Sequence, residues 1–203
     1  MATDDTKLEV LHGHYKDTYA CIQGHLKLRD RLFIFILLAV TLLSFQIFSP
    51  RKSGVVISDF ISARVGVSAG IDVSFIGSVI WFCLLGLVVR YFQTVVHVER
   101  QYSYIHGLEE QLGSHYDNKA FTREGKAYFN DYPTFSTWAW ILYTIIFPVL
   151  LLVVVFVKIV NEFRSTEPVT SLFIFNTAVF LCIVVSALLY LTSVHFRKKS
   201  NPD

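Results

Sequence analysis

Four long apolar runs constrain this chain more than any other feature of its sequence. They cover residues 32–48, 73–89, 137–157 and 171–194, and none of them contains Asp, Glu, Lys or Arg. Each run is close to the ~20 residues that a helix needs to cross a bilayer. The chain is 53% hydrophobic, and the charges lie almost entirely between the runs. The sequence therefore predicts an all-α membrane protein with four transmembrane helices.

The distribution of basic residues predicts the orientation of these spans. Of the 18 Lys and Arg residues, 13 fall before the first span, between the second and third, and after the fourth. The other two loops hold 5. Because cytoplasmic loops of membrane proteins carry an excess of Lys and Arg, we expect both termini in the cytoplasm. The cytoplasmic segments are then 1–31, 90–136 and 195–203, and the outer loops are 49–72 and 158–170.

Two of the spans continue as helices into the cytoplasm. Apolar residues recur at spacings of three and four from Leu8 to Leu26, and again from Tyr91 to Leu112, which is typical of one face of a helix. We expect one rod from Asp5 to Phe48 and a second helix that stops at Gly113, a favourable residue after a helix end. The stripe on the second helix must be covered, either by the N-terminal helix or by a second subunit. We predict a homo-oligomer, with a tetramer preferred.

The two longer connections carry helical patterns of their own. In the outer loop, apolar positions from Val56 to Val65 predict one or two turns of an interfacial helix, with a re-entrant pore loop as the alternative. In the cytoplasmic connector, Thr122 can cap a short helix from Arg123 to Asn130. This connector is either an elbow at the lipid headgroups or an element that binds a ligand.

The histidines and cysteines of the sequence show no spacing typical of a catalytic or metal site. All seven histidines lie on the predicted cytoplasmic side, and His12 and His14 lack the i, i+4 spacing of a helical metal site. The cysteines, at positions 21, 83 and 182, have no metal or redox spacing. We therefore expect no enzyme activity, no metal site and no cofactor.

The second span carries the best candidates for the lining of a pore. Ser74 and Ser78 are four residues apart and can wet a narrow path, while Asp72 and Arg90 flank the two ends of the span. The alternative is that these small residues allow close helix packing. In the fourth span, the amide of Asn176 should find a partner on another helix, and Pro148 predicts a kink in the third span.

Three segments resemble a known group of proteins. They are HYKDTYACIQGHLKLRDRLFIF at 14–35, RYFQTVVHVERQYSYIHGLEEQL at 90–112 and FTREGKAYFNDYPTFSTWAWILYTIIFPVLL at 121–151. They are similar to small bacterial four-span membrane proteins from anti-phage defence operons, and the layout resembles ion-channel effectors of the Hailong type. The resemblance implies an oligomeric channel that responds to a nucleotide made by a partner nucleotidyltransferase.

A nucleotide signal would need cations for its phosphates and aromatic rings for its bases. The cytoplasmic residues that offer these groups are Arg100, Lys119, Arg123 and Lys126, with Tyr102, Tyr104 and Tyr128. The alternative role for the cations is to hold anionic lipid headgroups. The sequence thus favours a channel gated from the cytoplasm, with a membrane-anchored scaffold or sensor as the second hypothesis and a membrane enzyme or transporter as the third.

The predicted topology can be tested by labelling single cysteines in intact cells, after replacement of the three native cysteines. A cysteine at Asn118 should resist an impermeant thiol reagent because it lies in the cytoplasm, whereas a cysteine at Thr166 should react. Labelling at position 118 would contradict the topology.

Overall fold

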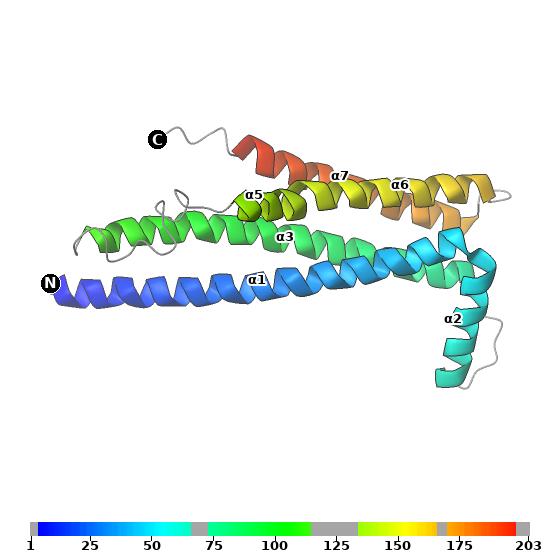
Figure 1. The fold of residues 1–203 in the computed structure, drawn as a ribbon, viewed down its shortest axis with the longest axis horizontal. Coiled ribbons are helices and arrows are strands. Elements are labelled where there is room, and N and C mark those ends of the chain that lie inside the picture. Colours follow the sequence, from blue (N-terminus) through cyan, green and yellow to red (C-terminus); the bar gives the residue numbers. More distant parts are fainter. Residues whose placement is uncertain (1–3, 66–72, 115–133, 166–169, 198–203) are drawn as a thin grey trace. The chain divides into compact units, whose positions relative to one another are not determined.

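The computed structural model describes residues 4–65, 73–114, 134–165 and 170–197, and no strand occurs among them (Figure 1). Within these described ranges, four helices are long and apolar enough to cross a membrane, which confirms a multi-pass, all-α membrane protein whose first two spans are extended. The predicted helix from Arg123 to Asn130 lies outside the described residues. The elements are α1 (Asp4–Phe48), α2 (Pro50–Val65), α3 (Val73–Gly113), α5 (Thr134–Ile141), the π-helical turn η1 (Leu142–Ile146), α6 (Phe147–Ser165) and α7 (Ser171–Arg197).

Local sequence explains where these helices begin and end. Helix α1 ends at Phe48, two residues before Pro50, because a proline disfavours helical geometry in the residue that precedes it. Helix α3 ends at Gly113, as predicted. Helix α7 is capped by Thr170, whose Oγ1 accepts a hydrogen bond from the backbone N–H of Phe173 at 3.3 Å. The predicted rod from the N-terminal region to Phe48 is confirmed as the 45 residues of α1.

The outer connection between α1 and α3 holds more helix than predicted. Helix α2 has 16 residues, whereas the apolar pattern predicted one or two turns. Pro50 occupies its first position, which is the helical site where proline is tolerated best. Within the helix only Gly54 is unfavourable, at a cost of about 1 kcal/mol relative to alanine, and this does not stop it.

The third span is interrupted one turn before Pro148. Proline lacks a backbone N–H, and its ring clashes with the carbonyl group four residues earlier, here that of Thr144. Thr144 lies within η1, so the irregularity falls where the proline predicts it. Beyond Pro148, helix α6 continues to Ser165, eight residues past the predicted end of the span at 157. Lys158 and Glu162 are therefore part of the same helix as the span.

The contacts divide the chain into two units, which are described separately. The polar unit comprises residues 1–31 and 93–143, and the membrane unit comprises residues 32–92 and 144–203. The first of these divisions, between Arg31 and Leu32, coincides with the predicted start of the first span.

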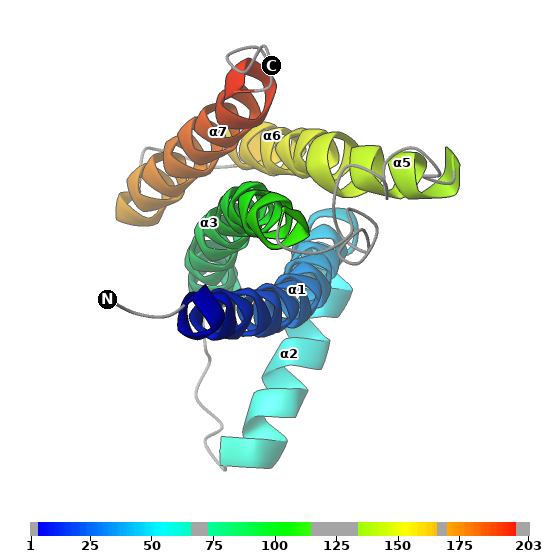
Figure 2. The same ribbon diagram turned by 90° about the vertical axis from the view of Figure 1, so that its left-hand side faces the viewer.

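Aromatic rings join the four spans within the membrane unit. Phe33 of α1 packs edge-on against Phe147 of α6 with ring centroids 4.7 Å apart, and Tyr91 of α3 packs edge-on against Phe147 at 5.4 Å. Next to Tyr91, Phe92 stacks on Tyr190 of α7 with centroids 4.3 Å apart. Helices α6 and α7 pack along one another, as the two views show (Figures 1 and 2). These contacts fix the helices that carry the candidate site.

Within the polar unit, α1 and α3 lie side by side. Their side chains contact one another at Tyr15 with Glu109 and at Cys21 with Gln101. The apolar stripe of α3 is buried inside the single chain; it includes Val98 (6% exposed), Ile105 (0%), Leu108 (5%) and Leu112 (0%). The stripe therefore needs no second subunit to cover it, and the prediction of an oligomer must rest on other grounds.

This burial predicts the effect of a charge in the stripe. Ile105→Asp should lower the free energy of unfolding of the polar unit by ~3 kcal/mol or more, because a carboxylate without a partner is strongly unfavourable in an apolar interior. The matched control is Tyr104→Asp, because Tyr104 is 55% exposed. Limited proteolysis of the purified full chain should show faster cleavage within residues 1–31 and 93–114 only for Ile105→Asp. Equal resistance of the two variants would contradict the burial.

Candidate functional site

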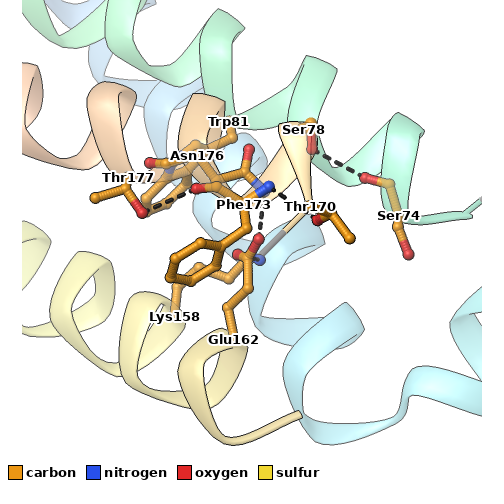
Figure 3. A network of polar contacts seen from close by, with 9 residues as sticks. All are labelled: Ser74, Ser78, Trp81, Lys158, Glu162, Thr170, Phe173, Asn176 and Thr177. Atoms are coloured by element: carbon orange, nitrogen blue, oxygen red, sulfur yellow. Dashed lines mark hydrogen bonds and ion pairs between the residues drawn. The ribbon is translucent and has the colours of Figure 1, made fainter. Parts of the chain in front are cut away.

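The membrane unit contains a cluster of large polar side chains, which we call the clasp. It consists of Trp81 from α3, Lys158 and Glu162 from α6, and Asn176 from α7 (Figure 3). Trp81 is 1% exposed and Asn176 is 4% exposed, and the side chains of Lys158 and Glu162 are each 15% exposed. The clasp thus places an ion pair in a largely buried position inside a bundle of apolar helices.

The clasp links three helices in a closed circuit. Lys158 Nζ lies 2.7 Å from Glu162 Oε2, one turn further along α6. The amide Nδ2 of Asn176 donates a hydrogen bond to Glu162 Oε1 at 2.5 Å, which connects α7 to α6. The indole N–H of Trp81 donates to the backbone carbonyl of Asn176 at 3.0 Å, which connects α3 to α7. The ammonium of Lys158 lies 5.9 Å from the centre of the Trp81 ring, which completes the circuit between α6 and α3.

Physical chemistry makes this cluster the leading candidate for function in the described part of the chain. An ionisable side chain within a membrane span is rare and unfavourable, and such residues typically mark ion pathways or relays. The pair here satisfies the basic condition for burial, because the carboxylate of Glu162 receives both an ammonium and an amide. One acceptor, Asn176 Oδ1, is buried without a hydrogen-bond partner among the described residues. The clasp is therefore held by several polar contacts, and the carbonyl oxygen of Asn176 is still able to accept a hydrogen bond.

Only part of the clasp could be predicted from the sequence. The prediction that Asn176 has a partner on another helix is confirmed, and the partner is Glu162. Lys158 and Glu162 themselves were assigned to an outer loop because the run free of charges ends at Val157. Their i, i+4 spacing directly after the run was the available clue, since Lys and Glu one turn apart indicate that a helix continues.

The predicted pore-lining residues of α3 face different surroundings. Ser74 is exposed, whereas Ser78 is 2% exposed and its hydroxyl donates to the carbonyl of Ser74 at 3.1 Å. At Gly77, an added Cβ would lie 2.9 Å from Oε1 of Gln46, so the glycine leaves room for this side chain of α1. These placements favour the packing interpretation for Ser78. Arg90 is exposed, and Asp72 lies outside the described residues.

The structure describes three of the seven residues predicted to bind a nucleotide. Arg100 and Tyr104 are exposed and lie one turn apart on α3, so a cation and an aromatic ring share one face. Tyr102 lies on another face, is partly buried, and packs its ring against His106 with centroids 6.4 Å apart. The other candidates, Lys119, Arg123, Lys126 and Tyr128, lie outside the described residues.

A second set of polar contacts lies between α1 and α3 in the polar unit. Glu109 is 4% exposed; its Oε1 accepts a hydrogen bond from the hydroxyl of Tyr15 at 3.2 Å, and its Oε2 lies 3.8 Å from Nδ1 of His106. Further along, the rings of His25 and His97 lie 4.5 Å apart. Within the described ranges, no group of three or more His, Cys, Asp or Glu side chains is arranged to hold a metal ion.

Comparisons with known proteins give no family. No family model matches the chain, and neither a curated protein nor a solved structure matches it.

The clasp predicts how the chain responds to loss of one charge. Lys158→Met should lower the free energy of unfolding by about 1–3 kcal/mol, because it leaves the carboxylate of Glu162 partly buried without its cation. The double variant Lys158→Met with Glu162→Gln should recover part of this loss, because it removes the unpaired charge. Thermal unfolding of the purified chain in mild detergent measures both effects.

The matched control for this experiment is Val157→Met, which changes an exposed neighbour on the same helix. A double variant that is no more stable than Lys158→Met would show that the two charges do not act as a pair.

Proposed function

We propose that the protein is the conducting subunit of an oligomeric ion channel in the bacterial inner membrane, gated from the cytoplasm by a nucleotide signal in anti-phage defence. The observation that carries the conduction is the clasp, in which Lys158 and Glu162 lie in a span and are only partly exposed. A purely structural protein gains little from a buried ion pair, because apolar residues of similar size would pack there without any cost of desolvation. Ionisable residues within membrane spans mark ion pathways, proton relays or voltage sensors.

The proposed receiver is the exposed face of α3 that carries Arg100 and Tyr104. The charged guanidinium group of arginine can donate several N–H hydrogen bonds to phosphate oxygens, and a tyrosine ring can stack on a base. A ligand shifts a gate only if it binds one state better than the other, and a tenfold bias needs about 1.4 kcal/mol. One charge-assisted hydrogen bond that forms in only one state of the gate contributes about 1.5–3 kcal/mol, which is sufficient for this tenfold bias. The resemblance to defence proteins supports a nucleotide produced by a partner nucleotidyltransferase as the ligand.

The proposed assembly is a homotetramer around a central axis. Its support is the apolar surface that each chain leaves exposed on its spans, which includes Phe35, Phe82, Phe156 and Leu189. In a membrane such surfaces contact lipid or other copies of the chain. Ser78 faces the interior of its own chain, so it cannot line a pore between chains. We therefore propose that Ser74 is the neutral polar residue of α3 that lines the central pore, and that Arg90 supplies a positive charge at one end of it.

A scaffold or sensor without conduction is the second candidate, and a specific observation favours it. The exposed side chains of the described spans are predominantly large and apolar, which suits contact with lipid better than contact with water. In this case the clasp only holds α3, α6 and α7 together, and the polar unit presents its surface to a partner protein.

Ion flux from proteoliposomes tests the proposal. Purified chain, shown by native mass spectrometry to be oligomeric, should release K⁺ or Cl⁻ at a rate that changes when oligonucleotides or cyclic nucleotides are added. Glu162→Gln should raise the ratio of anion to cation flux and Lys158→Gln should lower it, because each removes one sign of charge from the clasp, which packs against α3, the helix that we propose lines the path. Glu110→Gln, an exposed position on the polar unit, is the control.

The outcomes separate the alternatives. Absence of flux in several salts, with and without nucleotides, removes the channel and leaves the scaffold. Flux that responds to a nucleotide in the unaltered chain but not in Arg100→Ala supports the receiver. Flux that ignores every nucleotide, and persists in Arg100→Ala and in Arg123→Ala with Lys126→Ala, retains the pore and removes the receiver.

A further inference from the structure

Helix α2 follows the first span almost directly, with a very short linker between α1 and α2. Only Ser49 separates α1 from α2, and hydrogen bonds continue across it: the N–H of Ser49 donates to the carbonyl of Phe45, and the N–H of Ser53 donates to the carbonyl of Ser49. Helix α2 then turns away from α1 and from the other helices of the membrane unit (Figures 1 and 2). Its first turn is therefore fixed at the end of a membrane span.

Beyond this first turn, no part of the chain covers the described side chains of α2. Ser53 is 0% exposed, whereas Val55, Val56 and Phe60 are 60%, 56% and 63% exposed. An isolated helix of 16 residues is only marginally stable in water, because its nucleation is unfavourable. The exposed side chains among those described on α2 can therefore gain packing only from a surface outside this chain.

The exposed apolar surface continues from the span onto α2. Phe48, the last residue of α1, is 79% exposed, and Val56 and Phe60 lie one turn apart on α2. Charged residues accompany them: Asp59 is exposed, and the guanidinium of Arg64 lies 5.9 Å from the centre of the Phe60 ring. This combination is typical of helices that lie in the plane of a bilayer, with aromatic and aliphatic groups toward the acyl chains and charges toward the headgroups.

We propose that α2 is an interfacial helix that binds the bilayer at the level where α1 and α3 leave the hydrocarbon. Lipid is the occupant because the apolar surface of α2 continues that of a membrane span, and because α2 begins at the end of that span. The guanidinium of Arg64, 5.9 Å from the centre of the Phe60 ring, would lie among the headgroups beside this apolar surface. This proposal does not depend on conduction, and it holds for a channel or for a scaffold.

Spin labels on single cysteines test this placement in the full chain. Labels at Val56, Phe60 and Asp59 are compared in phosphatidylcholine–phosphatidylglycerol vesicles, after replacement of the three native cysteines. Oxygen, which concentrates in the acyl region, should relax the labels at 56 and 60 more than a water-soluble nickel chelate does. The label at 59 should show a lower ratio of oxygen to nickel accessibility, because position 59 points ~60° away from position 56 and ~100° away from position 60. A label at Tyr104, exposed on the polar unit, serves as the reference for water.

Two results would overturn the proposal. Nickel accessibility at 56 and 60 equal to that at Tyr104 would place α2 in water. Shielding of 56 and 60 from both reagents, relieved when labelled chains are diluted into excess lipid, would show that a second copy of the chain covers the helix. Because the labels occupy exposed sites, loss of folding is checked by thermal unfolding of each labelled chain in detergent.

Discussion

The lack of water in the hydrocarbon of a bilayer is the constraint on which this structure depends. Backbone groups must be paired within the spans, so the spans are helices, and polar side chains must find their partners in protein. Small hydroxyl groups meet this demand within their own helix: Thr41 donates to the carbonyl of Leu37, and Ser186 to that of Cys182. These hydroxyl groups form their hydrogen bonds within one helix, so these bonds do not connect two helices. The longer side chains of the clasp reach other helices, so they contribute to which helices associate and to their register.

The polar unit follows a different rule, because water competes there for every polar group. Burial of the apolar stripe of α3 stabilises the packing of α1 against α3. The polar contacts between the two helices determine their register. Glu109 is the clearest case, because a buried carboxylate is tolerated only where Tyr15 and His106 meet it. A slip of one turn along either helix would leave this carboxylate without its donor. Buried polar contacts of this kind fix register in paired helices.

Features that depend on neighbours in the sequence could be predicted, and features that depend on neighbours in space could not. The end of α3 at Gly113 and the irregularity before Pro148 follow from the conformational limits of single residues. The spacing of apolar residues predicts that one face of α3 is covered. It does not say whether the same chain or a second subunit buries Ile105, because that depends on how α1 packs against α3. Lys158 lies outside the span predicted from the sequence because the uncharged run ends at this residue. Ser78 has the same local sequence whether it faces a pore or its own bundle, so its direction needed the structure.

The ion pair of the clasp has an electrical consequence that follows from its position within one helix. Lys158 and Glu162 are one turn apart on α6, so any motion of this helix as a rigid body carries a positive and a negative charge together. The work done against a transmembrane potential depends on the net charge that moves, at about 2.3 kcal/mol per elementary charge per 100 mV. For the pair this net charge is zero. Sliding of α6 along the membrane normal would therefore be insensitive to voltage as far as this pair is concerned, and the membrane potential would act on it only through rotation or separation of the two side chains.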